Sequence, residues 1–179
     1  MIRKNTSGFT LIELLVVIFI ISIVTSVALL SISRNENRQL EAFTNELLQS
    51  VTLAEEHAML QPAVLGLSFA RESYQFLTYQ PPAGADKKQT WIPASDKLLD
   101  KHIIPSDIEL SIEVGGQKAI QQKDEEPEND EQPAHQPQVV ISTNGDITPF
   151  TIYVGKKGKS PRYVIKGDAD GNVSSKMLT

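Results

Sequence analysis

The sequence predicts an α+β protein in which one long amino-terminal helix, apolar at first and amphipathic later, packs on an antiparallel β-sheet domain. Three observations favour this fold class. A run of 20 residues without charge, 14–33, follows Glu13. Apolar residues then recur at helical spacing as far as Pro62. Beyond Pro62, short segments alternate between apolar and polar residues, which is typical of strands.

The composition excludes several kinds of functional site. The chain of 179 residues contains no cysteine, so it has no disulfide framework, no cysteine-ligated zinc and no thiol nucleophile. It carries 22 acidic and 17 basic residues, for a formal net charge of −5. An acidic chain of this kind is not expected to coat nucleic acid.

Residues 14–33 have the properties of a membrane-inserting helix. Fifteen of the 20 are apolar and five are Ser or Thr, whose hydroxyls can bond to the helix's own carbonyls. At about 1.5 Å per residue the run is roughly 30 Å long, which matches the hydrocarbon layer of a bilayer. Arg3 and Lys4 favour a cytoplasmic amino terminus, with the bulk of the chain in the periplasm. The alternative is a secretory signal peptide cleaved after Ala28.

Glu13 stands at the start of this apolar run and requires a partner. An isolated carboxylate in hydrocarbon is costly or takes up a proton. No Lys or Arg lies within one helical turn on its carboxyl side, which argues against an ion pair within the helix. A free α-amine would serve as the partner, and cleavage between Gly8 and Phe9 would create one close by.

The segment Gly8-Phe9-Thr10-Leu11-Ile12-Glu13, between a basic leader and a long apolar helix, resembles the processing site of type IV prepilins. That family includes the pseudopilins of type II secretion. The resemblance implies that a membrane peptidase cuts after Gly8 and N-methylates Phe9. It also implies that Glu13 pairs with the terminal amine of a neighbouring subunit during assembly. Residues 1–8 would then be the leader peptide, 9–33 the transmembrane and assembly helix, and 34–179 a periplasmic globular domain with a pilin-like fold.

From Arg34 to Gln61 the helix is expected to continue in amphipathic form, because apolar residues recur every three or four positions on one face. These residues are Leu40, Phe43, Leu47, Val51, Ala54 and Ala58. Pro62 ends the pattern, since proline cannot continue a helix. A sheet is expected to pack against this face.

About six short strands are expected after the helix, at 65–69, 74–79, 108–114, 138–142, 150–154 and 162–166. Asn144-Gly145-Asp146, between the fourth and the fifth, is a favoured tight-turn sequence. The segment 162–166 is expected to be the last strand. Trp91-Ile92-Pro93 is interpreted as a core plug rather than as a ligand platform.

Residues 116–138 are expected to form an acidic flexible loop between two strands. The stretch holds six acidic residues and three prolines, with nothing bulky and apolar between Lys123 and Gln138. Such a composition cannot bury enough surface to offset the entropy lost on ordering. The alternative is an acidic clamp for a basic partner or for cations.

Two further segments, 55–62 and 137–150, are similar to the H-type minor pseudopilins of type II secretion. Type IV pilus minor pilins share this outline, and the acidic insert departs from it. The resemblance implies a structural subunit near the tip of a short periplasmic filament that supports export of folded proteins across the outer membrane, and not an enzyme. The implied partners are other minor and major pseudopilins, the prepilin peptidase, the inner-membrane assembly platform and, before assembly, membrane lipid. The alternative is a type IV pilus minor pilin that acts in pilus assembly or DNA uptake.

No catalytic, cofactor or metal site is expected. The segment 66–70 lacks the second glycine of a nucleophile elbow. The segment 158–160 ends like a phosphate-binding loop, but Tyr153 occupies the position of its first glycine. Asp168, Asp170 and Asn172 imitate the start of a calcium loop, yet Thr179 stands where a bidentate Glu belongs, so a turn is expected instead. His57, His102 and His135 have no metal-ligand spacing.

A basic tract lies near the carboxyl end, made up of Lys156, Lys157, Lys159, Arg162 and Lys166. Some DNA-uptake pilins hold phosphates with such a tract. No aromatic ladder accompanies these cations beyond Tyr163, and the chain as a whole is acidic. A solvated hairpin is therefore expected here, and nucleic acid is not an expected partner.

Overall fold

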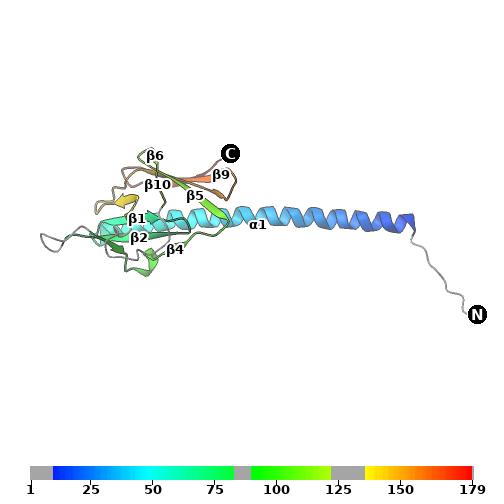
Figure 1. Cartoon of the computed structure of the whole chain (residues 1–179), viewed down its shortest axis with the longest axis horizontal. Coiled ribbons are helices and arrows are strands. Elements are labelled where there is room, and N and C mark those ends of the chain that lie inside the picture. The colour runs from blue at the N-terminus through cyan, green and yellow to red at the C-terminus, as the bar shows by residue number, and fades with distance from the viewer. Residues whose placement is uncertain (1–9, 83–89, 122–135, 179) are drawn as a thin grey trace, which may run out of the picture. The chain divides into compact units, whose positions relative to one another are not determined.

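The computed structural model describes residues 10–82, 90–121 and 136–178, apart from the side chains of 27–36. The chain divides into two compact units, Met1–Gln39 and Leu40–Thr179. Helix α1 (Leu11–Leu60) runs through both, and the strands belong to the second unit (Figure 1). The predicted α+β class is thus confirmed. Gly8, Phe9, His135 and most of the predicted acidic loop lie outside the described residues.

Helix α1 ends where the sequence predicts. Pro62 lacks the N–H that a further helical turn would need, and the last carbonyls are satisfied by the chain that follows. Gln61 N donates to His57 O at 2.9 Å, and Ala63 N donates to Ala58 O at 3.4 Å. The chain then turns directly into the first strand.

Two antiparallel sheets make up the rest of the second unit. The first has the order β3-β2-β1-β7, with β4 also paired to β2. The second has the order β10-β9-β8-β5-β6. The bounds of the first are β1 Leu65–Phe69, β2 Ser73–Gln80, β3 Thr90–Pro93, β4 His102–Ile103 and β7 Val139–Ile141, with a short 3-10 helix, η1, at Lys97–Leu99. Those of the second are β5 Ile108–Val114, β6 Gln117–Lys118, β8 Phe150–Lys156, β9 Pro161–Gly167 and β10 Val173–Met177.

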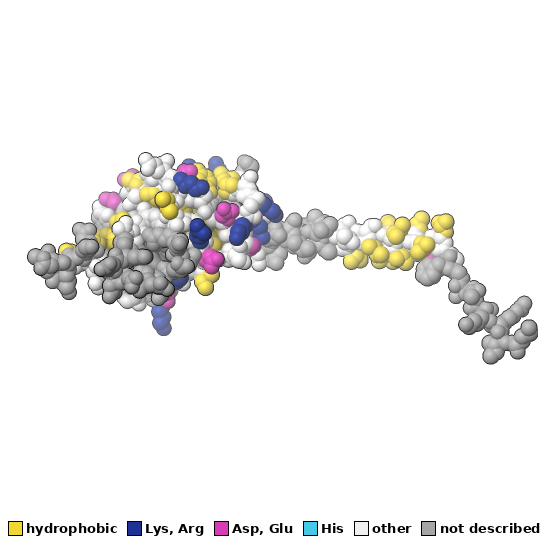
Figure 2. Space-filling model, viewed as in Figure 1, with side chains coloured by type: hydrophobic (Ala, Val, Ile, Leu, Met, Phe, Trp, Pro, Cys, Tyr) yellow, Lys and Arg dark blue, Asp and Glu magenta, His cyan; other side chains and the backbone are white. Residues whose placement is uncertain are grey.

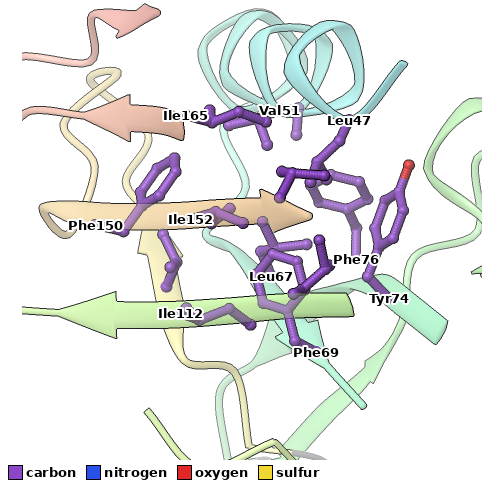
Figure 3. Close-up of a cluster of buried hydrophobic side chains, with 14 of the residues drawn as sticks. Leu47, Val51, Leu67, Phe69, Tyr74, Phe76, Ile112, Phe150, Ile152 and Ile165 are labelled. Atoms are coloured by element: carbon purple, nitrogen blue, oxygen red, sulfur yellow. The ribbon is translucent and has the colours of Figure 1, made fainter. Parts of the chain in front are cut away.

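One core joins the helix and both sheets. The predicted apolar face of α1 is buried, with Leu47, Val51, Ala54 and Ala58 wholly inaccessible to solvent. Figure 3 shows Leu47 and Val51 of the helix beside Ile152 and Ile165 of the second sheet. The same cluster contains side chains of the first sheet, among them Leu67, Phe69, Tyr74 and Phe76. The face predicted from spacing therefore packs against two sheets rather than one.

The strand at 162–166 is not the last one. β10 follows the 168–172 turn and pairs antiparallel with β9, from Val173 opposite Gly167 to Met177 opposite Tyr163. Its central residues, Ser174, Ser175 and Lys176, are exposed. β10 is an edge strand, and although Val173 packs against the core, Ser175 separates it from Met177 on the same face. The strand therefore has no continuous apolar alternation by which it could be recognised.

The turn at 144–146 forms, but it does not connect two paired strands. Ser142 N donates to Asp146 O at 2.8 Å, which closes the turn. β7 before it pairs with β1, whereas β8 after it pairs with β5 and β9. Thr148 then covers the free edge of β7, since its N–H donates to Val140 O at 2.9 Å. The turn therefore carries the chain from one sheet to the other.

Trp91 is not a core plug. It lies on β3, an edge strand whose four residues are half-buried or exposed. Its ring meets Tyr79 edge-on at a centroid distance of 5.4 Å, and it covers the outer face of the sheet at Gly66. A Cβ at Gly66 would lie 2.9 Å from the Trp91 ring and 2.5 Å from Pro137. The tryptophan therefore needs a glycine beneath it, which residue spacing alone does not show.

Two glutamines hold the ends of the predicted acidic loop. Gln138 Oε1 accepts from Phe69 N at 2.8 Å, and its Nε2 donates to Phe69 O and Ile120 O, both at 3.1 Å. Gln121 Nε2 donates to Leu110 O at 2.8 Å. The flanks of the predicted loop are therefore ordered, with β6 included, and its two ends meet at the bond between Gln138 and Ile120. The residues between, 122–135, lie outside the described part of the chain.

Gln138→Ala should lower the free energy of unfolding by about 1–3 kcal/mol, because Phe69 N and O lose their partner in a partly buried place. Chemical denaturation of the full chain measures the change. Gln80→Ala, which removes an exposed glutamine at the end of β2, is the matched control. Equal stabilities of the two variants would contradict the structural role of Gln138.

Candidate assembly site

Glu13 lies in the first turn of α1 and forms a capping box with Thr10. Thr10 N and Thr10 Oγ1 each lie 3.4 Å from Glu13 Oε2, and Glu13 N donates to Thr10 Oγ1 at 3.4 Å. These reciprocal bonds satisfy donors that the first turn of a helix leaves free. They are long, so the exposed carboxylate keeps most of its capacity to accept from a partner.

The capping box is a role for Glu13 that the sequence interpretation missed. Its signal was present, because Thr-x-x-Glu before an apolar run is a known start of a helix. The sequence interpretation considered only a partner outside the helix. The local role and the predicted intermolecular role require different chemistry, since a glutamine can fill the first but cannot supply the charge that the second would need.

The helix after Glu13 exposes a continuous apolar surface. Twelve large apolar side chains from Leu11 to Val24 are 43–83% exposed, and Figure 2 shows hydrophobic side chains along the visible face of this part of α1. Isolated soluble domains rarely expose so much contiguous apolar surface, which marks an interaction site. Over the described residues, no helix meets the length and hydropathy expected of a membrane span.

The hydroxyl groups of the described residues in the run 14–33 donate to carbonyls of the helix, as predicted; the side chains of Ser31 and Ser33 lie outside the described residues. Ser22 Oγ donates to Ile18 O and Thr25 Oγ1 donates to Ile21 O, both at 2.7 Å. Ser26 Oγ donates to Ser22 O at 2.8 Å. Because the hydroxyls are already bonded, an apolar environment can surround this surface at little cost in hydrogen bonds.

The 168–172 turn is held together by its own aspartate. Asp168 Oδ1 accepts from Asp170 N at 3.1 Å and from Asn172 N at 2.9 Å, and Asn172 Nδ2 also donates to this carboxylate. In the described part of the chain, no group of three or more acidic or histidine side chains is placed to hold a metal ion.

The histidines in the described residues serve as contacts between elements. His57 Nδ1 lies 3.6 Å from Asp96 Oδ2, at the start of η1. His102 of β4 stacks on Tyr74 with centroids 4.8 Å apart, and its Nδ1 lies 3.3 Å from Glu46 Oε1 of α1. Burial raises the pKa of Tyr74 to about 12. The two histidines lie on separate elements with different partners and do not form one site.

The basic tract divides between two ends of the second sheet. Lys156, Lys157, Lys159 and Arg162 lie at the β8–β9 turn, and we call these four residues the basic end. Lys156 Nζ donates to Asp107 Oδ2 at 2.9 Å, which lowers the pKa of Asp107. Lys166 lies farther along β9, opposite Thr151. The tract is therefore a turn between two strands, as predicted, with one cation on the strand beyond it.

Comparison with known proteins places the helix and the β domain in one family. A family profile described as the prokaryotic N-terminal methylation motif matches residues 3–29. The type II secretion system protein H of Pseudomonas aeruginosa is 30% identical over 160 residues, covering 89% of this chain and 88% of its own. The chain belongs to the type II secretion system protein H family.

Further similarities support the same family. The type II secretion system protein H of Aeromonas hydrophila is 27% identical over 96% of this chain and 93% of its own. The minor pseudopilin EpsH from the type 2 secretion system of Vibrio cholerae shares the fold, with a TM-score of 0.58 and 22% identity over 76% of this chain and 94% of that one. The protein is thus an H-type minor pseudopilin, and these relatives do not favour the type IV pilus alternative.

Glu55 of α1 lies against the turns at Gly145 and Gly171 of the β domain. Ionisation of its carboxyl group there costs free energy. A Cβ at Gly171 would lie 2.5 Å from Glu55 Oε1, and one at Gly145 would lie 3.5 Å from the same oxygen. Burial raises the pKa of Glu55 above its usual 4.5, with smaller contributions from Glu56 and Asp168. The folded state therefore binds this proton more tightly than the unfolded state does.

Stability should therefore fall as pH rises from about 4.5 through the folded pKa of Glu55, because the unfolded state then binds fewer protons than the folded one. Glu55→Gln should raise Tm at pH 7, and the gain should shrink toward pH 4. Thermal unfolding at both values measures the difference from the unsubstituted chain. Glu41→Gln, an exposed acid on the same helix, should show no such pH-dependent gain. A Glu55→Gln gain that is equal at both pH values would contradict the assignment.

Proposed function

We propose that this pseudopilin is cut between Gly8 and Phe9, N-methylated on Phe9, and assembled near the tip of the secretion pseudopilus. There it supports the export of folded proteins across the outer membrane. The observation that carries the proposal is the match of the methylation motif to residues 3–29, which includes both the cleavage position and the exposed apolar start of α1. In this proposal residues 1–8 are the leader, 9–33 the assembly helix and 34–179 the periplasmic domain.

Before assembly, the subunit is a single-pass protein of the inner membrane with its amino terminus in the cytoplasm. Arg3 and Lys4 support this orientation, because positive charge resists transfer across the bilayer. The charge-free run 14–33 has the length of a hydrocarbon layer. Its described hydroxyls are bonded within the helix. Lipid therefore covers the exposed apolar side chains from Leu11 to Val24 until assembly.

Assembly exchanges lipid for neighbouring helices. The new α-amine of Phe9 lies four positions before Glu13, so it is available to the Glu13 carboxylate of an adjacent subunit. In a medium of low dielectric constant an amine and a carboxylate attract strongly, whereas either one alone is costly. The pair therefore favours entry of a subunit only when its Phe9 α-amine lies level with the Glu13 carboxylate of its neighbour. Van der Waals packing of the apolar side chains supplies the rest of the association.

The role is structural and not enzymatic. The proposed partners are other minor and major pseudopilins, the prepilin peptidase that processes Gly8-Phe9, and the inner-membrane assembly platform. Neither a cofactor nor a metal is required by the proposal.

Two substitutions separate the intermolecular role of Glu13 from its capping role. Glu13→Gln keeps a side chain that can cap the helix but removes the charge. Thr10→Ala removes the cap but keeps the carboxylate. We expect Glu13→Gln to be processed and methylated normally and to co-purify with sibling pseudopilins at least tenfold less, a loss of about 1.4 kcal/mol. Thr10→Ala should assemble nearly as well as the unsubstituted chain.

Quantitative co-purification from the native host, with intact mass as the readout of processing, measures both variants. Glu41→Gln, an exposed acid farther along α1, is the matched control and should assemble normally. Equal losses of co-purification for Thr10→Ala and Glu13→Gln would show that assembly depends on the helix cap and not on the charge of Glu13. Normal assembly of Glu13→Gln would contradict the pairing.

A further inference from the structure

Strand β10 forms one edge of the second sheet, and among the described residues no strand pairs with its outer side. Its partner is β9 alone. The strand has five residues, Val173–Met177, with neither a proline nor a β-bulge. Natural sheets protect such edges with prolines, bulges, charges or covering segments, because unpaired N–H and C=O groups can bind another chain. Lys176 is the one such device within β10, so the edge is open to a further strand.

Two hydrogen bonds at the ends of the β9–β10 hairpin show which backbone groups of β10 face outward. Asp168 N donates to Asn172 O at 3.1 Å, and Leu178 N donates to Arg162 O at 2.7 Å. Bonded and non-bonded pairs alternate along an antiparallel ladder, so the even-numbered residues of β10 bond to β9 and the odd-numbered ones do not. The residues whose N–H and C=O groups point away from β9 are therefore Val173, Ser175 and Met177.

The other sheet edges in the described part of the chain are covered or shorter. Thr148 N donates to Val140 O of β7 at 2.9 Å. Carbonyls of β5 beyond β6 accept from Ala119 N and from Gln121 Nε2, both at 2.8 Å. Strands β4 and β6 have two residues each, and the four residues of β3 end in Pro93. Among these edges, β10 therefore offers the longest open row of backbone donors and acceptors.

The side chains beside this edge define the chemistry of a strand that fits it. On the inner face, Met177 is 48% exposed, so an apolar residue opposite it would cover it. On the outer face, Lys176 is exposed and would attract an acidic residue. Lys166 of β9 shares a hollow with Glu113 and Asp168, so we assign this attraction to Lys176 alone. The edge fits a strand that is apolar on one face and acidic on the other.

The shortness of the edge decides which kind of partner can use it. Three outward-facing residues cannot bury the roughly 1,200 Å² that a specific complex of two freely diffusing proteins needs. A partner that is already held beside the domain by another contact is under no such requirement, because its effective concentration is high. In the proposed assembly, helix packing holds a neighbouring pseudopilin in this way, whereas an exported protein that diffuses freely has no such attachment.

We propose that β10 pairs with an edge strand of a neighbouring pseudopilin, so that a backbone ladder joins the two globular domains. The inference rests on the proposed assembly and adds a contact between β domains to the packing of the helices. Before assembly, water satisfies the outward backbone groups, and the exposed polar side chains Ser174, Ser175 and Lys176 keep the edge soluble. After assembly, the strand of the neighbour satisfies the same groups.

Substitutions at Ser175 test the backbone contact. Ser175→Pro removes an N–H that faces outward, so β10 should still pair with β9. Ser175→Thr keeps the N–H and suits a strand. We expect Ser175→Pro to co-purify with sibling pseudopilins from the native host about fivefold less than the unsubstituted chain, which is the ratio that one lost hydrogen bond gives. Ser175→Thr should co-purify normally.

Reversal of one charge tests the outer face of the edge. Lys176→Glu should lower co-purification with sibling pseudopilins, because like charges opposite each other destabilise a strand pair. Lys118→Glu makes the same change at an exposed position of β6 and is the matched control. Equal co-purification of the two variants would contradict the acidic partner strand.

Residue-resolved hydrogen exchange tests the geometry directly. In the isolated subunit, the outward amides of Val173, Ser175 and Met177 should exchange fast, and those of Ser174 and Lys176 should exchange slowly. In the co-purified complex all five should exchange slowly. Fast exchange of the outward amides in the complex would contradict the pairing. Slow exchange of the same amides in the isolated subunit would show that the edge is already covered, which also contradicts it.

The outcomes separate this inference from the proposed function. If the unsubstituted chain co-purifies with no pseudopilin, the proposed assembly is wrong. If it co-purifies and Ser175→Pro does so equally well, only the β10 inference is wrong. Because the chain contains no cysteine, a photoreactive group can be attached at Ser174→Cys alone. Capture of a sibling pseudopilin supports the inference, and capture of an exported protein or of a second copy overturns it. Circular dichroism shows whether Ser175→Pro is folded; if it is not, hydrogen exchange and cross-linking of the other chains decide.

Discussion

Burial of one stripe of α1 is the constraint on which the rest of the second unit depends. Leu47 and Val51 lie in a single cluster with strands of both sheets, and among the described strands none of one sheet pairs with a strand of the other. The helix is therefore the element that both sheets share. Because apolar burial is the main favourable term in folding, the two sheets stay together chiefly through the core that they build on this stripe.

The sequence revealed the elements whose burial is periodic. The stripe of α1 and the alternation of β5 each follow from residue spacing, because one face of each element is buried and the other is not. It did not reveal pairings that depend on distant residues. The strands on either side of the 144–146 turn belong to different sheets, and β10 has polar residues on both faces. Trp91 depends on Gly66 beneath it, 25 positions earlier, which no local pattern records.

The prediction for Glu13 stays untested, whereas its local hydrogen bonds are seen in the structure. Glu13 was singled out because a carboxylate at the start of an apolar run needs a partner, and that argument requires no coordinates. The bonds between Thr10 and Glu13 are visible in the structure and were implicit in the sequence.

The two units differ in whether their described apolar side chains are buried. In the second unit the helix buries its apolar stripe against its own chain, so the fold is complete within one subunit. In the first unit, the described apolar side chains from Leu11 to Val24 remain exposed, so their burial requires lipid or another subunit. A carboxylate tolerates an apolar environment only when a donor accompanies it, so the proposed pairing of Glu13 would make that burial selective. In the proposal, removal of the leader supplies the donor.

The central claim is that the protein becomes an assembly subunit by exchanging its leader for a free, methylated amine beside Glu13. Intact mass spectrometry of the protein from the membrane fraction of its native host tests this most directly. The account predicts a chain that begins at Phe9 and carries one added methyl group. A chain that still contains residues 1–8, or one that begins unmodified at Leu29, would contradict it.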